Sequence, residues 1–168
     1  MNSTLLVNVF RFVFLLALQI LVFNNMNFVG YISAFPYILF IILYPVNGNK
    51  ANLLISSFFL GLIMDLFCNS GGVHATACVL LAYMRPAFFK FSFGLSYEYQ
   101  TIKLNDVLTP ERFSFILLAV ITHNSILFLL ESFQIYFLLD VLIRTVLSTL
   151  FTILICIILI YLIKPNKR

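Results

Sequence analysis

The residues of this chain that could do chemistry are concentrated in GLIMDLFCNSGGVHATACVLLAYMRP, residues 61–86, a stretch that is otherwise apolar. It holds Asp65, His74 and Arg85. Carboxylates and imidazoles are the groups that proteins use as general acids, general bases and metal ligands. However, no carboxylate lies three or four residues after His74 or after His123, the other histidine of the chain. We therefore expect no metal site.

Catalytic patterns are also missing from the sequence. There is no nucleophile paired with a base and no pair of carboxylates at catalytic spacing. The letters NSGG at 69–72 lack the lysine of a phosphate-binding loop, so they predict a turn. We expect neither enzymatic activity nor a cofactor.

Asp65 lies fourteen residues beyond Ala51, where its apolar run begins. At the rise of an α helix this is roughly 21 Å, which places the carboxylate near the far end of a helix. Two interpretations stand at this point. Asp65 is either an exposed carboxylate at a helix end or part of a packing or partner-binding site.

A second polar stretch is ITHNSILFLLESF, residues 121–133, in which four consecutive polar residues, Thr122 to Ser125, interrupt an apolar run. Consecutive residues point around most of a helix, so some of them must form hydrogen bonds to other helices. We prefer this role to a substrate site. Glu131 lies about two turns beyond His123, too far for direct contact.

Asp140 and Arg144 have opposite charges and stand four residues apart. On a helix they can neutralise each other on one face. This intrahelical pair would explain both charges without a role in transport.

The elements that must position these residues are membrane helices. Of the 168 residues, 62% are hydrophobic and 10% are charged, and the mean hydropathy is +1.08. A soluble domain is about 45–50% apolar and about 25% charged, so the composition predicts an integral membrane protein. The basic residues are scattered singly, so the net charge of +4 indicates membrane topology rather than nucleic-acid binding.

A helix needs about 20 apolar residues to cross the hydrocarbon core. On this rule residues 1–168 form a single all-α transmembrane domain, and we predict six spans at 5–23, 28–46, 51–67, 71–89, 113–130 and 137–163. The fourth has an uninterrupted apolar core only over 77–84, so its glycines can instead begin a re-entrant segment. Residues 90–112 mix aromatic and charged side chains, which suits a cytoplasmic loop on the membrane surface.

The basic residues predict the orientation. With the N-terminus inside, the cytoplasmic loops, the adjoining span ends and the tail hold eight of the ten, Lys50, Arg85, Lys90, Lys103, Arg112, Lys164, Lys167 and Arg168. Positive residues accumulate on the cytoplasmic side of membrane proteins. We therefore expect both termini in the cytoplasm and three short external loops.

The segments GLIMDLF, SGGVHA, LLAYMRP and THNSILFLLESF together resemble the rod shape-determining protein MreD family, particularly its Bacteroidetes-type members. Length, six predicted spans and cytoplasmic tails agree with that family over nearly the whole chain. The specific motifs occupy about forty residues. The positions that match the family pattern are Gly61, Asp65, Gly71, Gly72, His74, Arg85, Pro86, His123 and Glu131.

The resemblance implies a non-enzymatic component of the cell-elongation machinery in the bacterial inner membrane. Members of the family associate with the bitopic protein MreC, and through it with MreB, RodA and a penicillin-binding transpeptidase, so that lateral peptidoglycan synthesis is organised. The implied fold is a six-helix bundle similar to the substrate-binding subunits of energy-coupling-factor transporters. The matching residues would then shape a helix-packing core or a surface for MreC.

The alternative is a vitamin-binding subunit of a membrane transporter, because polar groups in the third to fifth spans could line a pocket. Such subunits commonly carry an Ala-x-x-x-Ala face on the first span, whereas RFVFLLALQILVF holds one alanine, Ala17, among bulky residues. An orphan membrane assembly factor is a third possibility that the sequence does not separate from the first.

Overall fold

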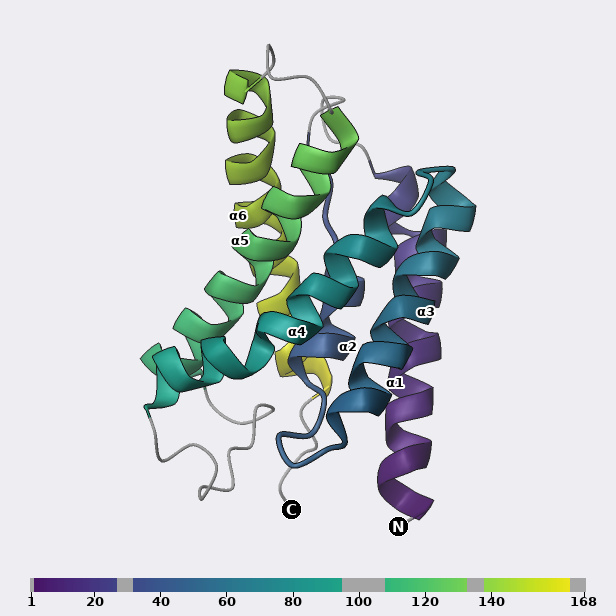
Figure 1. Ribbon diagram of the computed structural model, residues 1–168, viewed down its shortest axis with the longest axis vertical. Coiled ribbons are helices and arrows are strands. Elements are labelled where there is room, and N and C mark those ends of the chain that lie inside the picture. The colour runs from purple at the N-terminus through teal and green to yellow at the C-terminus, as the bar shows by residue number, and fades with distance from the viewer. Residues whose placement is uncertain (1, 27–31, 95–107, 133–137, 164–168) are drawn as a thin grey trace.

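The computed structural model describes residues 2–26, 32–94, 108–132 and 138–163, and within these ranges the regular structure is helical. In chain order its elements are α1 (Asn2–Leu21), η1 (Phe23–Asn25), η2 (Pro36–Ile38), α2 (Leu39–Ile42), α3 (Lys50–Cys68), α4 (Val73–Phe93), α5 (Pro110–Ser132) and α6 (Leu138–Ile163). The five long helices run between the same two ends of the molecule, and α1 begins at the end where α6 finishes (Figure 1).

Four helices among the described residues are long and apolar enough to cross a membrane, namely Leu6–Asn25, Lys50–Cys68, Pro110–Ser132 and Leu139–Leu162. The all-helical character predicted from the sequence is therefore confirmed for the described residues, and these four helices suit the predicted membrane protein. Many of their side chains are apolar and exposed, for example Leu6, Leu66 and Leu162. Such surfaces suit lipid, because acyl chains are as apolar as leucine.

The fourth predicted span is one continuous helix, so the structure gives no support to a re-entrant start. α4 has 21 residues, with Pro86 in its interior. That length corresponds to about 31 Å, close to the thickness of a bilayer core of about 30 Å. Gly71 and Gly72 lie before the helix, in the turn that follows α3.

The prediction of a helix over residues 28–46 is wrong. Residues 28–31 lie outside the described ranges, and from 32 onward only η2 and the four-residue α2 are helical. Pro36 lacks a backbone donor and disfavours helical geometry at Phe35, whose φ of −121° and ψ of 58° lie outside the helical region. An apolar run cannot by itself be distinguished from a buried irregular segment.

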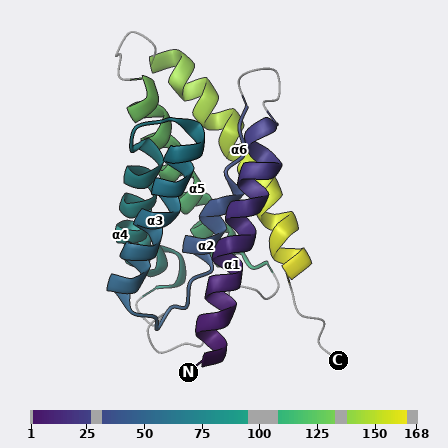
Figure 2. The ribbon, with the colours of Figure 1, turned by 90° about the vertical axis from the view of Figure 1, so that its right-hand side faces the viewer.

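We call residues 32–44 the central segment, because the other elements enclose it. All residues from 34 to 43 are buried. Its helices η2 and α2 contact α1, α4 and α6, and they lie among the long helices in both ribbon views (Figure 2). The segment leads the chain from the end where α1 finishes back to the end where α3 begins.

Side chains from α1 and α6 bind the extended start of the central segment. Gln19 Nε2 donates to the carbonyl of Ala34 at 3.1 Å. The backbone N–H of Ser33 donates to Ser148 Oγ, and that of Phe35 to Thr152 Oγ1, each at 3.2 Å. A backbone donor without a partner is costly where there is no water, so these bonds make irregular backbone tolerable inside the bundle.

Two arginines bind the other end of the central segment. Arg11 Nη1 donates to the carbonyl of Leu43 at 2.9 Å, and Arg85 Nη2 donates to the carbonyls of Ile42, at 3.3 Å, and Tyr44. These carbonyls lie at or just beyond the C-terminus of α2, where a helix leaves acceptors open and a cation is favourable.

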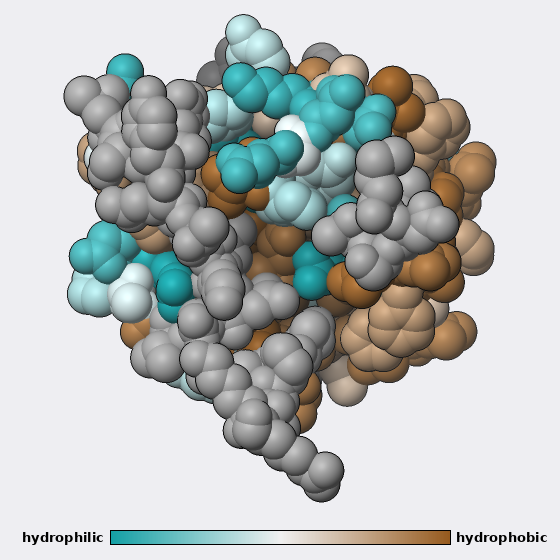
Figure 3. All heavy atoms as spheres, turned by 90° about the horizontal axis from the view of Figure 1, so that it is seen from below, coloured by the Kyte–Doolittle hydropathy of each residue, from teal (hydrophilic) through white to brown (hydrophobic). Residues whose placement is uncertain are grey.

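Figure 3 shows the end of the molecule where α1 begins. Hydrophilic residues gather over part of this face, and hydrophobic residues lie toward its edge. Lys50, Lys90 and Arg112 belong to the helix ends at this side, whereas Glu131 and Asp140 belong to helix ends at the opposite side.

Candidate functional site

Asp65 lies near the end of α3 and is 6% exposed. Its Oδ1 accepts hydrogen bonds from Ser70 Oγ at 2.5 Å and from the His74 N–H at 2.9 Å, and its Oδ2 accepts from the Ala75 N–H at 2.9 Å. The carboxylate therefore caps the first turn of α4, where backbone donors are open and negative charge is favourable. An exposed helix-end carboxylate is excluded, and Asp65 is a packing residue.

Gly61 lies one turn before Asp65, where α3 packs tightly against the start of α4. A Cβ on Gly61 would lie 2.4 Å from Ala75 Cα and 2.5 Å from the His74 carbonyl oxygen. Real Cβ atoms do not approach backbone this closely, so glycine is required for space. The i, i+4 pair of Gly61 and Asp65 thus brings α4 against α3 and caps its start.

The turn between α3 and α4 needs its glycines for a different reason. Gly71 and Gly72 have φ angles of +64° and +99°, and a Cβ on either would meet nothing within 4 Å. Glycine adopts positive φ without the penalty that a Cβ imposes. Asn69 also has positive φ, at 53°, and ends α3 in the left-handed region.

A chain of hydrogen bonds crosses the core from α4 to α6. Tyr37 OH lies 2.9 Å from His74 Nδ1 and 2.8 Å from His123 Nε2. His123 Nδ1 lies 3.2 Å from Asn124 Oδ1, and Asn124 Nδ2 donates to Thr149 Oγ1 at 3.1 Å. These bonds join α4, η2, α5 and α6. The prediction that some residues among Thr122 to Ser125 bond to other elements is confirmed for His123 and Asn124.

Donors and acceptors can be assigned along these hydrogen bonds in one consistent direction when both imidazoles are neutral. With the Asn124 amide donating to Thr149, its Oδ1 must accept from His123 Nδ1–H, and His123 Nε2 is then an acceptor. Tyr37 donates its single hydroxyl proton to that nitrogen, so it accepts from His74 Nδ1–H. His74 therefore keeps Nε2 as an acceptor without a partner among the described residues.

Arg85 is turned into the bundle rather than toward its surface. It is 6% exposed, and its guanidinium carbon lies 4.7 Å from the centre of the Phe89 ring. Through this ring contact and its bonds to the central segment, Arg85 fixes the end of α2 against α4. Pro86 follows it directly and has no N–H for the carbonyl of Ala82, one turn earlier.

Glu131 and Arg144 lie apart from this network, beside a cavity of about 340 Å³. Arg144 has its guanidinium carbon 5.8 Å from the centre of the Phe128 ring, and Asp140 is half-buried. The pairing of Asp140 with Arg144 stays a prediction.

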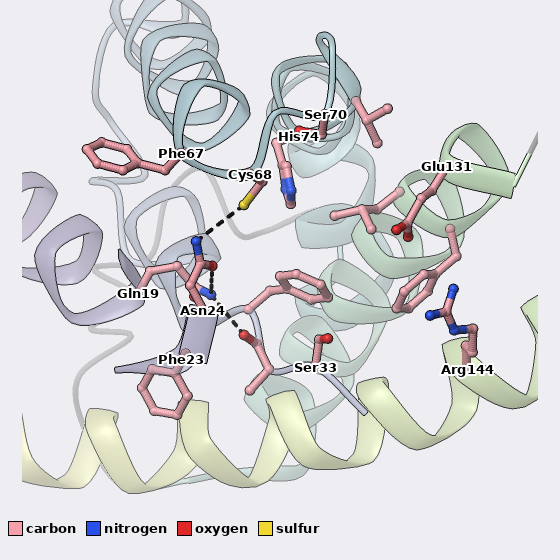
Figure 4. A pocket seen from close by; sticks show the side chains of 15 residues that line it. Gln19, Phe23, Asn24, Ser33, Phe67, Cys68, Ser70, His74, Glu131 and Arg144 are labelled. Atoms are coloured by element: carbon pink, nitrogen blue, oxygen red, sulfur yellow. Dashed lines mark hydrogen bonds between the residues drawn. The ribbon is translucent and has the colours of Figure 1, made fainter. Parts of the chain in front are cut away.

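The cavity lies between the end of α1, the turn after α3, the end of α5 and the first half of α6 (Figure 4). Four phenylalanines line it, together with polar residues from five elements, among them Gln19, Asn24, Ser70, His74, Glu131 and Arg144. His74 belongs both to the cavity wall and to the hydrogen-bond chain. Within the described ranges no group of three or more His, Cys, Asp or Glu residues could hold a metal ion.

Sequence analysis did not identify Gln19, Tyr37, Ser148 or Thr152 as site residues. Gln19, Ser148 and Thr152 could have been identified from the sequence, because each is a polar residue inside an apolar run, as His123 is. Tyr37 gave no such signal, since tyrosine is common near membrane surfaces.

The fold and its buried polar network define a helical membrane protein whose polar residues connect helices to one another. Comparison of the chain with family models, with curated proteins and with solved structures found no match.

Proposed function

We propose that the chain is a non-enzymatic scaffold of the rod shape-determining MreD type, which binds MreC in the bacterial inner membrane and helps to organise lateral peptidoglycan synthesis. The observation that carries the proposal is the convergence of the residues on which the resemblance rests. These residues come together at the α3–α4 hairpin, to which Gly61, Asp65, Gly71, Gly72 and His74 belong. Arg85 joins the hairpin to the central segment, and His123 bonds to the same segment from α5.

The state of these polar groups also favours a scaffold. The Asp65 carboxylate accepts three hydrogen bonds, and His123 is fully buried with both ring nitrogens bonded. Groups that are already saturated fix the shape of a bundle. A scaffold depends on such a fixed shape, because it presents one surface to its partner.

The proposed orientation has both termini in the cytoplasm and six crossings, of which the central segment is the second. It is supported by Lys50, Lys90 and Arg112, which belong to helix ends on the side where α1 begins. Positive residues favour the cytoplasmic side of a membrane.

The second candidate is a small-molecule-binding subunit of a transporter, and the cavity beside His74 favours it. Ligand sites typically enclose about 300–1,000 Å³, and this cavity has about 340 Å³. The exposed, bulky face of α1, including Phe10 and Val13, does not resemble the small-residue surface that close helix docking needs.

Depletion of the protein in its native cells distinguishes the two functions. The scaffold proposal expects rod-shaped cells to become round or swollen while uptake of added vitamins is unchanged. Normal cell shape together with a loss of uptake of one vitamin would favour the transporter subunit instead. Complementation by the unaltered gene is the control for effects on neighbouring genes.

A further inference from the structure

The cavity beside His74 has features of a built binding site. His74 is 5% exposed and lines the cavity, and Figure 4 shows its imidazole pointing into the space between Cys68 and Glu131. With both imidazoles neutral, the hydrogen-bond chain makes Nδ1 the donor to Tyr37, and the remaining nitrogen, Nε2, is then an acceptor directed away from that bond. A ligand would therefore meet a fixed acceptor on a buried side chain.

The described part of the cavity wall carries one charge of each sign. Glu131 supplies a carboxylate from the last turn of α5, and Arg144 supplies a guanidinium from α6 (Figure 4). Glu131 is exposed, so the charges on the wall are partly hydrated, and a wall of balanced charge favours a ligand without net charge. The same two groups favour a ligand that carries both an ammonium and an anionic group.

The rest of the lining mixes polar residues, such as Asn24 and Ser70, with apolar and aromatic ones. Phe23, Phe35, Phe67 and Phe128 contribute rings to the wall. Aromatic rings bind apolar bodies and also attract ammonium groups over their faces. A further acceptor, Gln19 Oε1, is buried at the wall without a partner among the described residues.

We propose that this cavity binds a small zwitterion attached to an apolar body, with its ammonium group held by Glu131 and His74 Nε2 and its anionic group by Arg144. A free apolar amino acid or dipeptide has this chemistry, and so does the headgroup of phosphatidylethanolamine. The proposal goes beyond the scaffold function, and neither depends on the other.

The test measures binding to the full-length purified protein by isothermal titration calorimetry. L-phenylalanine represents a free amino acid and glycerophosphoethanolamine represents the lipid headgroup. Phenylalaninamide and 3-phenylpropionate lack the anionic and the ammonium group of phenylalanine, respectively. We expect at least one zwitterion to bind, and removal of either charge from phenylalanine, if it is the one bound, to weaken binding about tenfold or more.

A pair of variants locates the site. Glu131→Gln should weaken binding of the zwitterion about tenfold, whereas Glu111→Gln, the same change at an exposed position at the other end of α5, should leave it unchanged. Binding of L-phenylalanine alone would identify a free amino acid, and binding of glycerophosphoethanolamine alone would identify the lipid headgroup. If neither zwitterion binds, or if the two variants bind it equally, the proposal is overturned. The titration contains no MreC, so either result leaves the scaffold function untouched.

Discussion

A buried carboxylate can be stabilised by backbone donors instead of by a cation, and Asp65 is held in this way. Two backbone N–H groups and one hydroxyl donate to it at the start of α4. The N–H groups in the first turn of any helix lack acceptors within the helix, so the carboxylate and these two N–H groups supply each other's hydrogen bonds. The position of an aspartate in an apolar stretch thus has a structural explanation.

Replacement of Asp65 by alanine should lower the melting temperature of the purified protein, because the N–H groups of His74 and Ala75 would lose their acceptors. Each unsatisfied buried donor costs about 1–3 kcal/mol. Asp65→Asn should cost less, since an amide oxygen can still accept one bond. Glu111→Ala, which removes an exposed carboxylate, is the control. Equal melting temperatures for Asp65→Ala and Glu111→Ala would contradict the capping role.

The partners of individual residues were the hardest part to predict from the sequence. Tyr37 is bonded to two histidines that stand 37 and 86 positions away, and no local pattern links them. Interhelical bonding by His123 and Asn124 could be predicted, because polar residues inside a membrane helix need partners. Which helix supplies the partner depends on packing that periodicity does not encode.

At the scale of elements, the contact between α3 and α4 depends on Gly61, whereas the turn after α3 depends on Gly71. Gly61→Ala should force the two helices apart, and overpacking of this kind typically costs about 1–3 kcal/mol or more. Gly71→Ala has space for its methyl group but retains a positive φ, so its cost should be only about 1–2 kcal/mol.

Thermal unfolding in detergent, together with cysteine crosslinking between α3 and α4, separates these two effects. Gly61→Ala should reduce both the melting temperature and the yield of the crosslink. Gly71→Ala should reduce the melting temperature with the crosslink retained. A Gly61→Ala protein with unchanged crosslinking would show that the helices do not meet at this glycine.

The hydrogen bonds between the central segment and α6 can be tested with isosteric substitutions on α6. Thr152→Val removes the acceptor of the buried Phe35 N–H and should cost about 1–3 kcal/mol of the free energy of unfolding. Thr145→Val is the matched control on the same helix, because Thr145 Oγ1 is buried without a hydrogen-bond partner among the described residues. Thr145→Val should leave the free energy of unfolding unchanged or raise it. The reverse order of melting temperatures would contradict the assignment.

Most elements could be predicted because long apolar runs and helix signals agree. α5 begins at Pro110, and Thr109 Oγ1 accepts from the Arg112 N–H at 3.4 Å, which is the N-cap that the residues TPER at this helix start favour. The irregular backbone of the central segment could not be predicted, since its apolar run has the length of a span. Pro36 is the interruption within that run. Its backbone bonds come from α1, α4 and α6, which no reading of the segment alone reveals.

At the scale of the whole molecule, the two ends of the bundle should face opposite sides of the membrane. Asn47→Cys and Asn69→Cys, in a Cys68→Ser background, place single exposed thiols before and after α3. An impermeant thiol reagent applied to intact spheroplasts should label the cysteine at 69 and not that at 47. Labelling of both, or of 47 alone, would contradict the proposed orientation.

The proposed binding of MreC can be tested by purifying the tagged, full-length protein from its native membranes and identifying by mass spectrometry what remains bound. The proposal predicts that MreC is retained and is enriched over a tagged membrane protein of similar size. Absence of MreC from a preparation that is folded by its melting curve would contradict the proposed function.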